Sequence, residues 1–233
     1  MTGDLAALHH AIDAAGGTRM RRDPRSPAEV LHGVAALDAS SLDVGEAADL
    51  LRLMAESILH APVPERVRQG CRALLQQDAR ALVRMVVERR EPPRSLGAFL
   101  AWKALGRTVG APQHSGCATG LQRVATCPTC GAPPAMARLQ ENARSLCCGL
   151  CGTQWSYARV GCPYCGGEEP ASVLEPEDEP AFRIDVCRAC NAYLKTFVGA
   201  ADPQALSDWT TLHLDAACAA RGLRRGGPSL YDL

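Results

Sequence analysis

Long apolar runs are absent from this 233-residue sequence, which has no stretch of about 18 apolar residues such as a membrane-spanning helix requires. The first twenty residues also lack the basic and then apolar segments of a secretory leader. Arg21-Arg22 do not make a twin-arginine signal, because DPRS follows where an apolar region should begin. We therefore expect a cytoplasmic protein that does not insert into a membrane.

A net charge is also lacking. Lys and Arg number 25, as do Asp and Glu, so the whole chain has no electrostatic attraction toward nucleic acid or anionic lipid. The hydrophobic content of 47% and the charged content of 21% are those of a globular protein and exclude a chain that is disordered throughout. None of the six histidines forms a closely spaced pair near the cysteines. Cysteine is therefore the residue type to consider as a metal ligand.

Cysteine is abundant, and eight of the twelve cysteines occur in four Cys-x-x-Cys pairs. In a cytoplasmic protein such pairs favour metal binding over disulfide bonds. Each pair lets two thiolates reach one ion from a single tight turn, here called a knuckle, and a tetrahedral zinc or iron ion takes four thiolates. The expected metal ligands are Cys127, Cys130, Cys148, Cys151, Cys162, Cys165, Cys187 and Cys190.

The residue after each pair supports this interpretation. In a knuckle that residue commonly has a positive φ, a conformation that favours glycine or asparagine. The four positions hold Gly131, Gly152, Gly166 and Asn191. The motif CPTCG at 127 also recurs as CPYCG at 162, so the pattern is an internal repeat and predicts two metal ions.

The spacing between pairs suggests how they combine. Seventeen residues separate Cys130 from Cys148, and 21 separate Cys165 from Cys187, which is close to the range of ribbon-type sites. We assign the first two pairs to one ion and the last two to the other, with crossed pairing as the alternative. Cys147 is either an alternative ligand or a buried neighbour on the opposite strand face. The remaining thiols, apart from a loop cysteine at 117, lie on apolar helical faces at Cys71 and Cys218.

A site filled by four protein ligands has no open coordination position for hydrolytic catalysis. We therefore expect no catalytic residues and a structural role for the ions, which the sequence leaves as iron or zinc. Residues 122–200 carry seven basic and eight acidic side chains, and eight thiolates around two divalent ions add four more negative charges. Such a segment is a poor surface for phosphates, so we expect no nucleic-acid partner.

Residues 1–110 have the pattern of a small helical bundle. Residues 26–29 form a capping box that predicts a helix to about Leu37, and residues 43–46 repeat the signal before a second helix. A further helix is expected from Ser95, followed by a linker over 111–123. Between Pro64 and Pro92 we expect one long helix whose inward side chains are Val67, Cys71, Leu74, Leu75, Leu82, Met85 and Val86.

From residue 124 onward the sequence has short apolar runs separated by glycine and proline, which favours strands at 144–147, 154–160 and 182–186. We therefore expect an α+β protein, in which the helical bundle precedes two rubredoxin-like or zinc-ribbon modules of four cysteines each, residues 124–160 and 161–200. A C-terminal helix is expected over 201–222 and a tail over 223–233. The aromatic residues of the modules are expected either to fill their small cores or to contact a partner: Trp155, Tyr157 and Tyr193.

Four segments in order, CPTCGAPP, LCCGLCGTQWSYARVGCPYCG, CRACNAYLK and WTTLHLDAACAARG, resemble the FdhE family of formate dehydrogenase accessory proteins. The resemblance covers about residues 122–222. It implies a cytoplasmic, rubredoxin-like iron protein that is not an enzyme and that binds the molybdenum-containing catalytic subunit of formate dehydrogenase during its maturation. Two other classes stay open: a zinc-ribbon protein that binds nucleic acid, and an iron or thiol redox protein.

Overall fold

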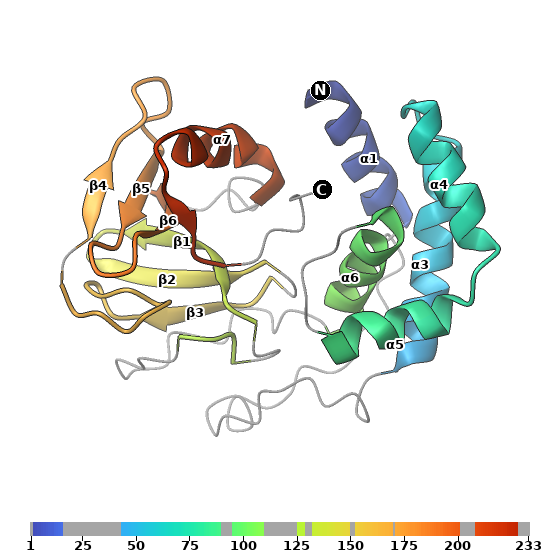
Figure 1. Ribbon diagram of the computed structural model, residues 1–233, viewed down its shortest axis with the longest axis horizontal. Helices are drawn as coiled ribbons and strands as arrows, with labels where there is room; N and C mark the ends of the chain where they lie inside the picture. The colour runs from blue at the N-terminus through green and yellow to red at the C-terminus, as the bar shows by residue number, and fades with distance from the viewer. Residues whose placement is uncertain are drawn as a thin grey trace. The chain divides into compact units, whose positions relative to one another are not determined.

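The protein combines a helical unit with a unit built on a β-sheet, as Figure 1 shows. The expected α+β class is therefore confirmed. No helix among the described residues is long and apolar enough to span a membrane. The computed structural model describes residues 2–15, 43–89, 95–109, 125–128, 132–149, 152–169, 171–200 and 208–227.

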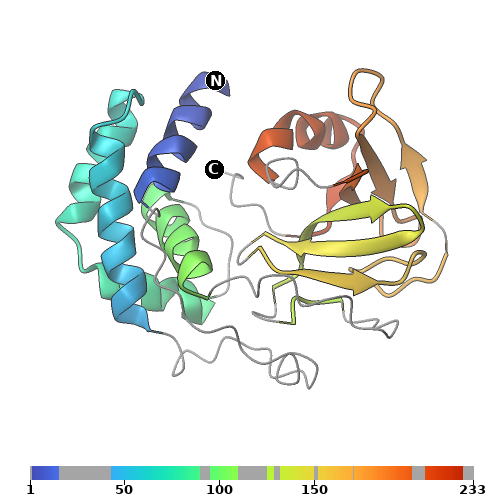
Figure 2. The same ribbon diagram turned by 180° about the vertical axis from the view of Figure 1, so that it is seen from behind.

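The helical unit packs around one central helix. Helix α3 contacts each of the other four, and its buried side chains, among them Leu51, Met54 and Ile58, recur at helical spacing. Asp43 caps this helix as the sequence predicts, because its carboxylate accepts a hydrogen bond of 3.0 Å from the backbone N–H of Glu46. The helices, seen from both sides in Figures 1 and 2, are α1 (Thr2–Ala15), α3 (Val44–Leu59), α4 (Glu65–Leu75), α5 (Ala79–Arg89) and α6 (Leu96–Val109).

The prediction of one long helix between Pro64 and Pro92 is wrong, because the chain breaks between α4 and α5. The carboxylate of Asp78 starts the second helix by accepting hydrogen bonds from the backbone N–H groups of Arg80 (2.9 Å) and Ala81 (3.2 Å). The break also shifts the helical phase. Met85, expected inside, is exposed, whereas Val86 is buried as expected, together with Ala79, Val83 and Val87.

Two expected segments lie outside the described residues. They are the helix expected over residues 26–37 and the linker expected over residues 111–123.

The second unit contains one seven-stranded sheet in the order β3-β2-β1-β6-β5-β4, with β7 pairing with β6. Neighbouring strands are antiparallel except for the pairs β1–β6 and β6–β7, which are parallel. The strands are β1 (Pro134–Gln140), β2 (Ala143–Cys148), β3 (Gln154–Tyr157), β4 (Ser172–Leu174), β5 (Phe182–Val186), β6 (Ala192–Val198) and β7 (Arg224–Arg225).

The pairing of β1 with β6 places the two cysteine-containing segments in a common sheet. Met136 lies beside Lys195 and Leu139 beside Val198 in this register. The boundary expected at residues 160 and 161 falls in the connection between β3 and β4, with three strands of the main path on either side. The segments 124–160 and 161–200 are therefore two halves of one sheet.

Each half of the sheet has a small hydrophobic cluster. Ala137, Leu146 and Tyr157 pack with Leu194 of β6 in the first half. In the second half the core is completed by helix α7 (Leu212–Ala220), and this cluster consists of Ile184, Val186, Tyr193, Leu214 and Cys218. The first cluster takes one member from the other half, so the two cores depend on the same strand pairing.

The C-terminal part differs from the single helix and tail expected over 201–222 and 223–233. A 3₁₀ turn, Asp208–Thr211, precedes α7, and residues 201–207 lie outside the described part. The hydroxyl of Thr211 donates to the backbone carbonyl of Asp208 (3.1 Å), which stabilises this turn. Within the expected tail, Arg224–Arg225 form β7, because the backbone beside the start of β6 is open to pairing.

We predict that Asp78→Ala lowers the free energy of unfolding of the helical unit by about 1 kcal/mol, because two backbone N–H groups lose their acceptor. Urea denaturation of the full chain, followed by helical circular dichroism, measures this change. Asp78→Asn should retain most of the stability, since asparagine is also a good cap. Gln77→Ala, at the exposed neighbouring position, is the control. Equal loss from Asp78→Ala and Gln77→Ala would contradict the capping role.

Candidate metal centre

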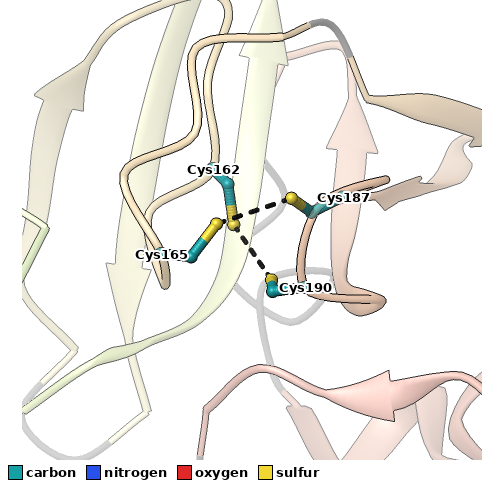
Figure 3. Close-up of side chains that lie close together, drawn as sticks. All are labelled: Cys162, Cys165, Cys187 and Cys190. Carbon is teal, nitrogen blue, oxygen red and sulfur yellow. Dashed lines mark hydrogen bonds between the residues drawn. The ribbon is translucent and has the colours of Figure 1, made fainter.

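Four thiols of the second half converge at one point between the strands. Cys162 and Cys165 lie in the turn after β3, and Cys187 and Cys190 lie in the turn between β5 and β6. Figure 3 shows their sulfur atoms directed toward a common centre, and all four lie within 4.8 Å of one another. The Sγ atoms of Cys162 and Cys190 are 3.8 Å apart, and those of Cys165 and Cys187 are 3.6 Å apart.

These distances suit a metal ion. Four sulfurs at about 2.3 Å from a tetrahedral zinc ion are about 3.8 Å from one another. The separations of 3.6 and 3.8 Å are close to that value and far longer than a disulfide bond of about 2.05 Å. The group can therefore hold a zinc or iron ion, and the third and fourth Cys-x-x-Cys pairs supply two ligand atoms each.

The backbone of each knuckle is closed by two hydrogen bonds. The N–H of Cys162 donates to the carbonyl of Gly167 (2.8 Å), and the carbonyl of Cys162 accepts from the N–H of Gly166 (3.0 Å). Cys187 makes the matching bonds with Ala192 (2.8 Å) and Asn191 (2.9 Å). Gly166 and Asn191 have φ of 73° and 56°, the sign expected from their positions after the pairs.

The thiols of this group differ in their environment. Burial raises the pKa of Cys162 to about 12. Burial also opposes ionisation of Cys187, but the backbone N–H groups of Cys190 and Ala189 lower its pKa to about 7. A bound cation favours thiolate at every ligand, so metal binding displaces protons from this group.

The first half repeats the same backbone closure. The N–H of Cys127 donates to the carbonyl of Ala132 (2.8 Å), and the N–H of Cys148 donates to the carbonyl of Thr153 (2.9 Å). Gly152 has φ of 73° and donates to the carbonyl of Cys148 (3.2 Å). Cys127 and Cys148 are both buried. Their expected co-ligands, together with the first knuckle glycine, lie outside the described residues: Cys130, Cys151 and Gly131.

Three other cysteines are buried without joining the group of four. Cys147 is directed away from Cys148 by the alternation of β2, and burial raises its pKa to about 12. Burial likewise raises the pKa of Cys71, to about 11, in the helical unit. Cys218 lies in the hydrophobic cluster under α7. Cysteines buried in apolar surroundings, away from other donor atoms, are chemically inert and serve in packing. Cys117 lies outside the described residues.

A small cavity adjoins two of the four thiols, Cys162 and Cys187. The cavity beside them measures ≈ 20 Å³, and its walls include Arg144, Cys162, Tyr164 and Cys187. That volume is of the order needed for one water molecule, about 10–15 Å³ or more. The guanidinium of Arg144 also donates to the carbonyl of Gly161 (2.9 Å), which fixes the residue before the knuckle. The surroundings of the thiols thus hold the knuckle in place.

The aromatic residues considered as partner contacts divide between core and surface. Tyr157 and Tyr193 are buried members of the two hydrophobic clusters, so a surface role for them is not consistent with the structure. Alternation along β3 and β6 directs both rings into the core. Trp155 packs against the first cluster and stays half-buried.

A set of buried charges, which local sequence patterns do not reveal, lies near the knuckle of Cys187 and Cys190. Lys195 of β6 is 1% exposed, and its Nζ lies 2.6 Å from a carboxylate oxygen of Asp208 and 2.7 Å from one of Asp215. Arg225 lies 2.6 Å from Asp208 and 2.7 Å from Asp215. The feature of the sequence that could have indicated this group is Lys195 itself, a charged residue within the mainly apolar strand segment AYLKTFV.

This arrangement defines a class of protein: an α+β protein with a group of four cysteines, on paired knuckles, that could hold a metal ion. The sequence model of the FdhE central domain matches residues 126–159. A curated FdhE homolog from Stutzerimonas stutzeri is 35% identical over 113 residues, covering 45% of this chain and 37% of the relative. An FdhE homolog from Pseudomonas aeruginosa is 30% identical, with 45% and 38% covered, and one from Shewanella baltica is 32% identical, with 41% and 35% covered.

The crystal structure of the FdhE protein from Pseudomonas aeruginosa has the same fold, with a TM-score of 0.69 and 23% sequence identity. The superposition covers 97% of this chain and 86% of that one. The sequence matches, by contrast, span little more than a third of the length of the curated relatives. Across its cysteine-containing part this chain is similar to FdhE proteins in both sequence and fold, so the resemblance seen in the sequence is confirmed.

We predict that Cys162→Ser removes about one equivalent of bound metal, because three thiolates and a hydroxyl hold zinc or iron less well than four thiolates. Cys127→Ser should remove the other equivalent. Elemental analysis after anaerobic purification measures both. Cys147→Ser is the matched control, since its thiol is buried outside the group. Loss of both equivalents from either ligand variant would indicate crossed or cooperative sites, and full retention would contradict the ligand assignment.

Proposed function

We propose that this protein is an accessory protein for the maturation of formate dehydrogenase, and that it binds the catalytic subunit of that enzyme in the cytoplasm. The observation that carries the proposal is the convergence of Cys162, Cys165, Cys187 and Cys190 in a chain that is similar to FdhE proteins. The family name and the metal knuckles together favour this function over other cysteine-rich classes.

We propose that two ions are bound, each by four thiolates. Cys127, Cys130, Cys148 and Cys151 hold one, and the four converging thiols hold the other. The repeated backbone closure around Cys127 and Cys148 supports the first site. Either iron, as the family resemblance implies, or zinc suits such a donor set.

A structural and recognition role for the ions is favoured over catalysis. Four protein ligands leave no open coordination position, and the adjoining cavity holds no more than about one water molecule. Metal fixes the backbones of the knuckles, which lowers the entropy cost of binding a partner there. Trp155, half-buried at the edge strand β3, is the aromatic side chain that we propose for contact with the catalytic subunit.

We predict that chelation under reducing conditions unfolds the sheet-containing unit and leaves the helical unit folded. A structural zinc ion contributes roughly 10 kcal/mol or more to folding in small peptides, as much as the whole stability of a typical domain. The hydrophobic clusters that the structure describes in the two halves of the sheet are small compared with that contribution. Circular dichroism and limited proteolysis follow the change. An unchanged protease pattern after complete metal removal would contradict a structural role.

We predict that the wild-type protein captures the catalytic subunit of formate dehydrogenase from an anaerobically grown host, whereas Cys162→Ser captures less. Affinity purification followed by mass spectrometry of that subunit measures this. The matched control is Cys147→Ser, which changes a thiol outside the metal group. If the wild type captures no catalytic subunit and deletion of its gene leaves formate oxidation intact, the proposed function is wrong. If Cys162→Ser captures as much catalytic subunit as the wild type, the ion proposed at the four converging thiols has a local structural role only.

A further inference from the structure

Residues 222–227, here called the C-terminal strap, contact both halves of the cysteine-containing sheet. Gly222 ends α7 with a φ of 69°, and its N–H and that of Leu223 donate to the carbonyls of Ala219 (2.9 Å) and Cys218 (3.1 Å). This turn directs the strap back toward β6. There β7 pairs with the first two residues of β6, which directly follow the knuckle of Cys187 and Cys190.

The strap is hydrogen-bonded to the turn residue of that knuckle. The side-chain amide of Asn191 donates to the carbonyl of Gly222 (3.0 Å), and the carbonyl of Asn191 accepts from the N–H of Arg224 (3.0 Å). Asn191 is also the residue whose positive φ closes the knuckle around Cys187. The strap therefore holds both the side chain and the backbone of a residue on which the position of two ligand thiols depends.

The strap also packs on the other knuckle of the same site. Tyr164 lies between Cys162 and Cys165, and a Cβ atom at Gly226 would come within 1.9 Å of its ring. The hydroxyl of Tyr164 donates to the carbonyl of Pro134 at the start of β1 (3.1 Å). A Cβ atom at Gly227 would lie 2.5 Å from that same carbonyl. The two glycines thus allow the strap to lie flat against both halves of the sheet.

The strap is anchored by the buried charges described above. Arg225 pairs with Asp208 and Asp215, which also pair with Lys195, and the hydroxyl of Tyr193 donates to Asp215 (2.7 Å). Two cations face two carboxylates, so the group carries no net charge. Burial opposes ionisation of Asp208, but Lys195 and Arg225 hold its pKa below the ordinary value. Burial also opposes the charge of Arg225, whereas the two carboxylates raise its pKa.

Each charge in this group depends on its partners, because a buried ion that loses its partner keeps its desolvation cost without compensation. Arg225 is the only member contributed by the strap. Its removal would leave two carboxylates facing Lys195 alone and would take away the side chain that holds the strap against β6. These ion pairs therefore favour the position in which the strap is paired with β6 over one in which it is detached.

We propose that the C-terminal strap, anchored by Arg225, positions both knuckles of the Cys162, Cys165, Cys187 and Cys190 site and thereby controls how tightly that site retains its metal ion. Arg225, Gly226 and Asn191 are positioning residues that do not touch the ion. Side chains outside the ligand set commonly change metal affinity by about 10- to 100-fold. The proposal rests on the metal ligation put forward under Proposed function.

The test uses the full-length, metal-loaded protein and a chromogenic chelator in excess, which gives the rate of metal release for each equivalent. We expect Arg225→Ala to release one equivalent about 10- to 100-fold faster than the wild type and the other at the wild-type rate. Arg225→Lys should restore part of the retention, because it keeps a cation facing the carboxylates. Arg224→Ala, the exposed neighbour on the same strand, should release both equivalents at the wild-type rate.

A second variant disturbs the strap without changing charge. Gly226→Ala places a methyl group against the ring of Tyr164 and should accelerate release of the same equivalent. Arg224→Ala remains the control here, since it changes an exposed side chain of the same strap.

Three outcomes overturn the inference. One is equal release from Arg225→Ala and Arg224→Ala. Another is a Gly226→Ala variant that retains metal as the wild type does. The third is an Arg225→Ala protein whose metal-loaded sheet is already protease-sensitive, with both equivalents lost together, since that shows general unfolding. A wild type that holds no metal at these four thiols would instead refute the proposed metal ligation, so the two failures are distinguishable.

Discussion

The parallel pairing of β1 with β6 is the interaction on which the rest of the sheet-containing unit depends. Each strand belongs to a different cysteine-containing half, and the clusters described in the two halves contain four and five buried residues. Leu194 of β6 enters the cluster of the first half, and Tyr164 of the second half donates to Pro134 of β1. Knuckles far apart in the sequence are thereby fixed on one framework.

Several side chains of strand β6 make polar contacts with other elements. The strand begins beside Asn191, which closes a knuckle. Farther along it, Tyr193 and Lys195 both bind the carboxylate of Asp215. Thr196 then donates to Asp185 on β5 (2.7 Å), a carboxylate that also faces Arg183. Burying so many polar groups is costly unless each is paired, and these partners come from β5, the 3₁₀ turn, α7 and β7. The strand therefore joins the C-terminal segment to the sheet that carries the four converging thiols.

Several features followed from local sequence alone. The cap at Asp43 and the positive φ at Gly166 and Asn191 are properties of a few neighbouring residues, so composition and spacing predicted them. Within the group of Cys162, Cys165, Cys187 and Cys190, the arrangement of each pair is likewise local, because a tight turn places both thiols of a pair on one side. The break before Asp78 was missed, although Asp78 is itself a capping residue, since the apolar period on both sides suggested one helix.

The sequence by itself determined the cysteine pairs, their turn residues, the α+β class and the resemblance to FdhE. Only the tertiary structure decided that the two halves share one sheet, that Tyr157 and Tyr193 face the core, and that Arg225 reaches Asp208 and Asp215. The physical reason is range: turns and caps are set by residues a few positions apart, whereas strand order and ion pairing depend on which distant surfaces bury each other. Lys195 shows this most clearly, because a lysine becomes compatible with a buried strand only when two carboxylates from a later segment of the chain pack over it.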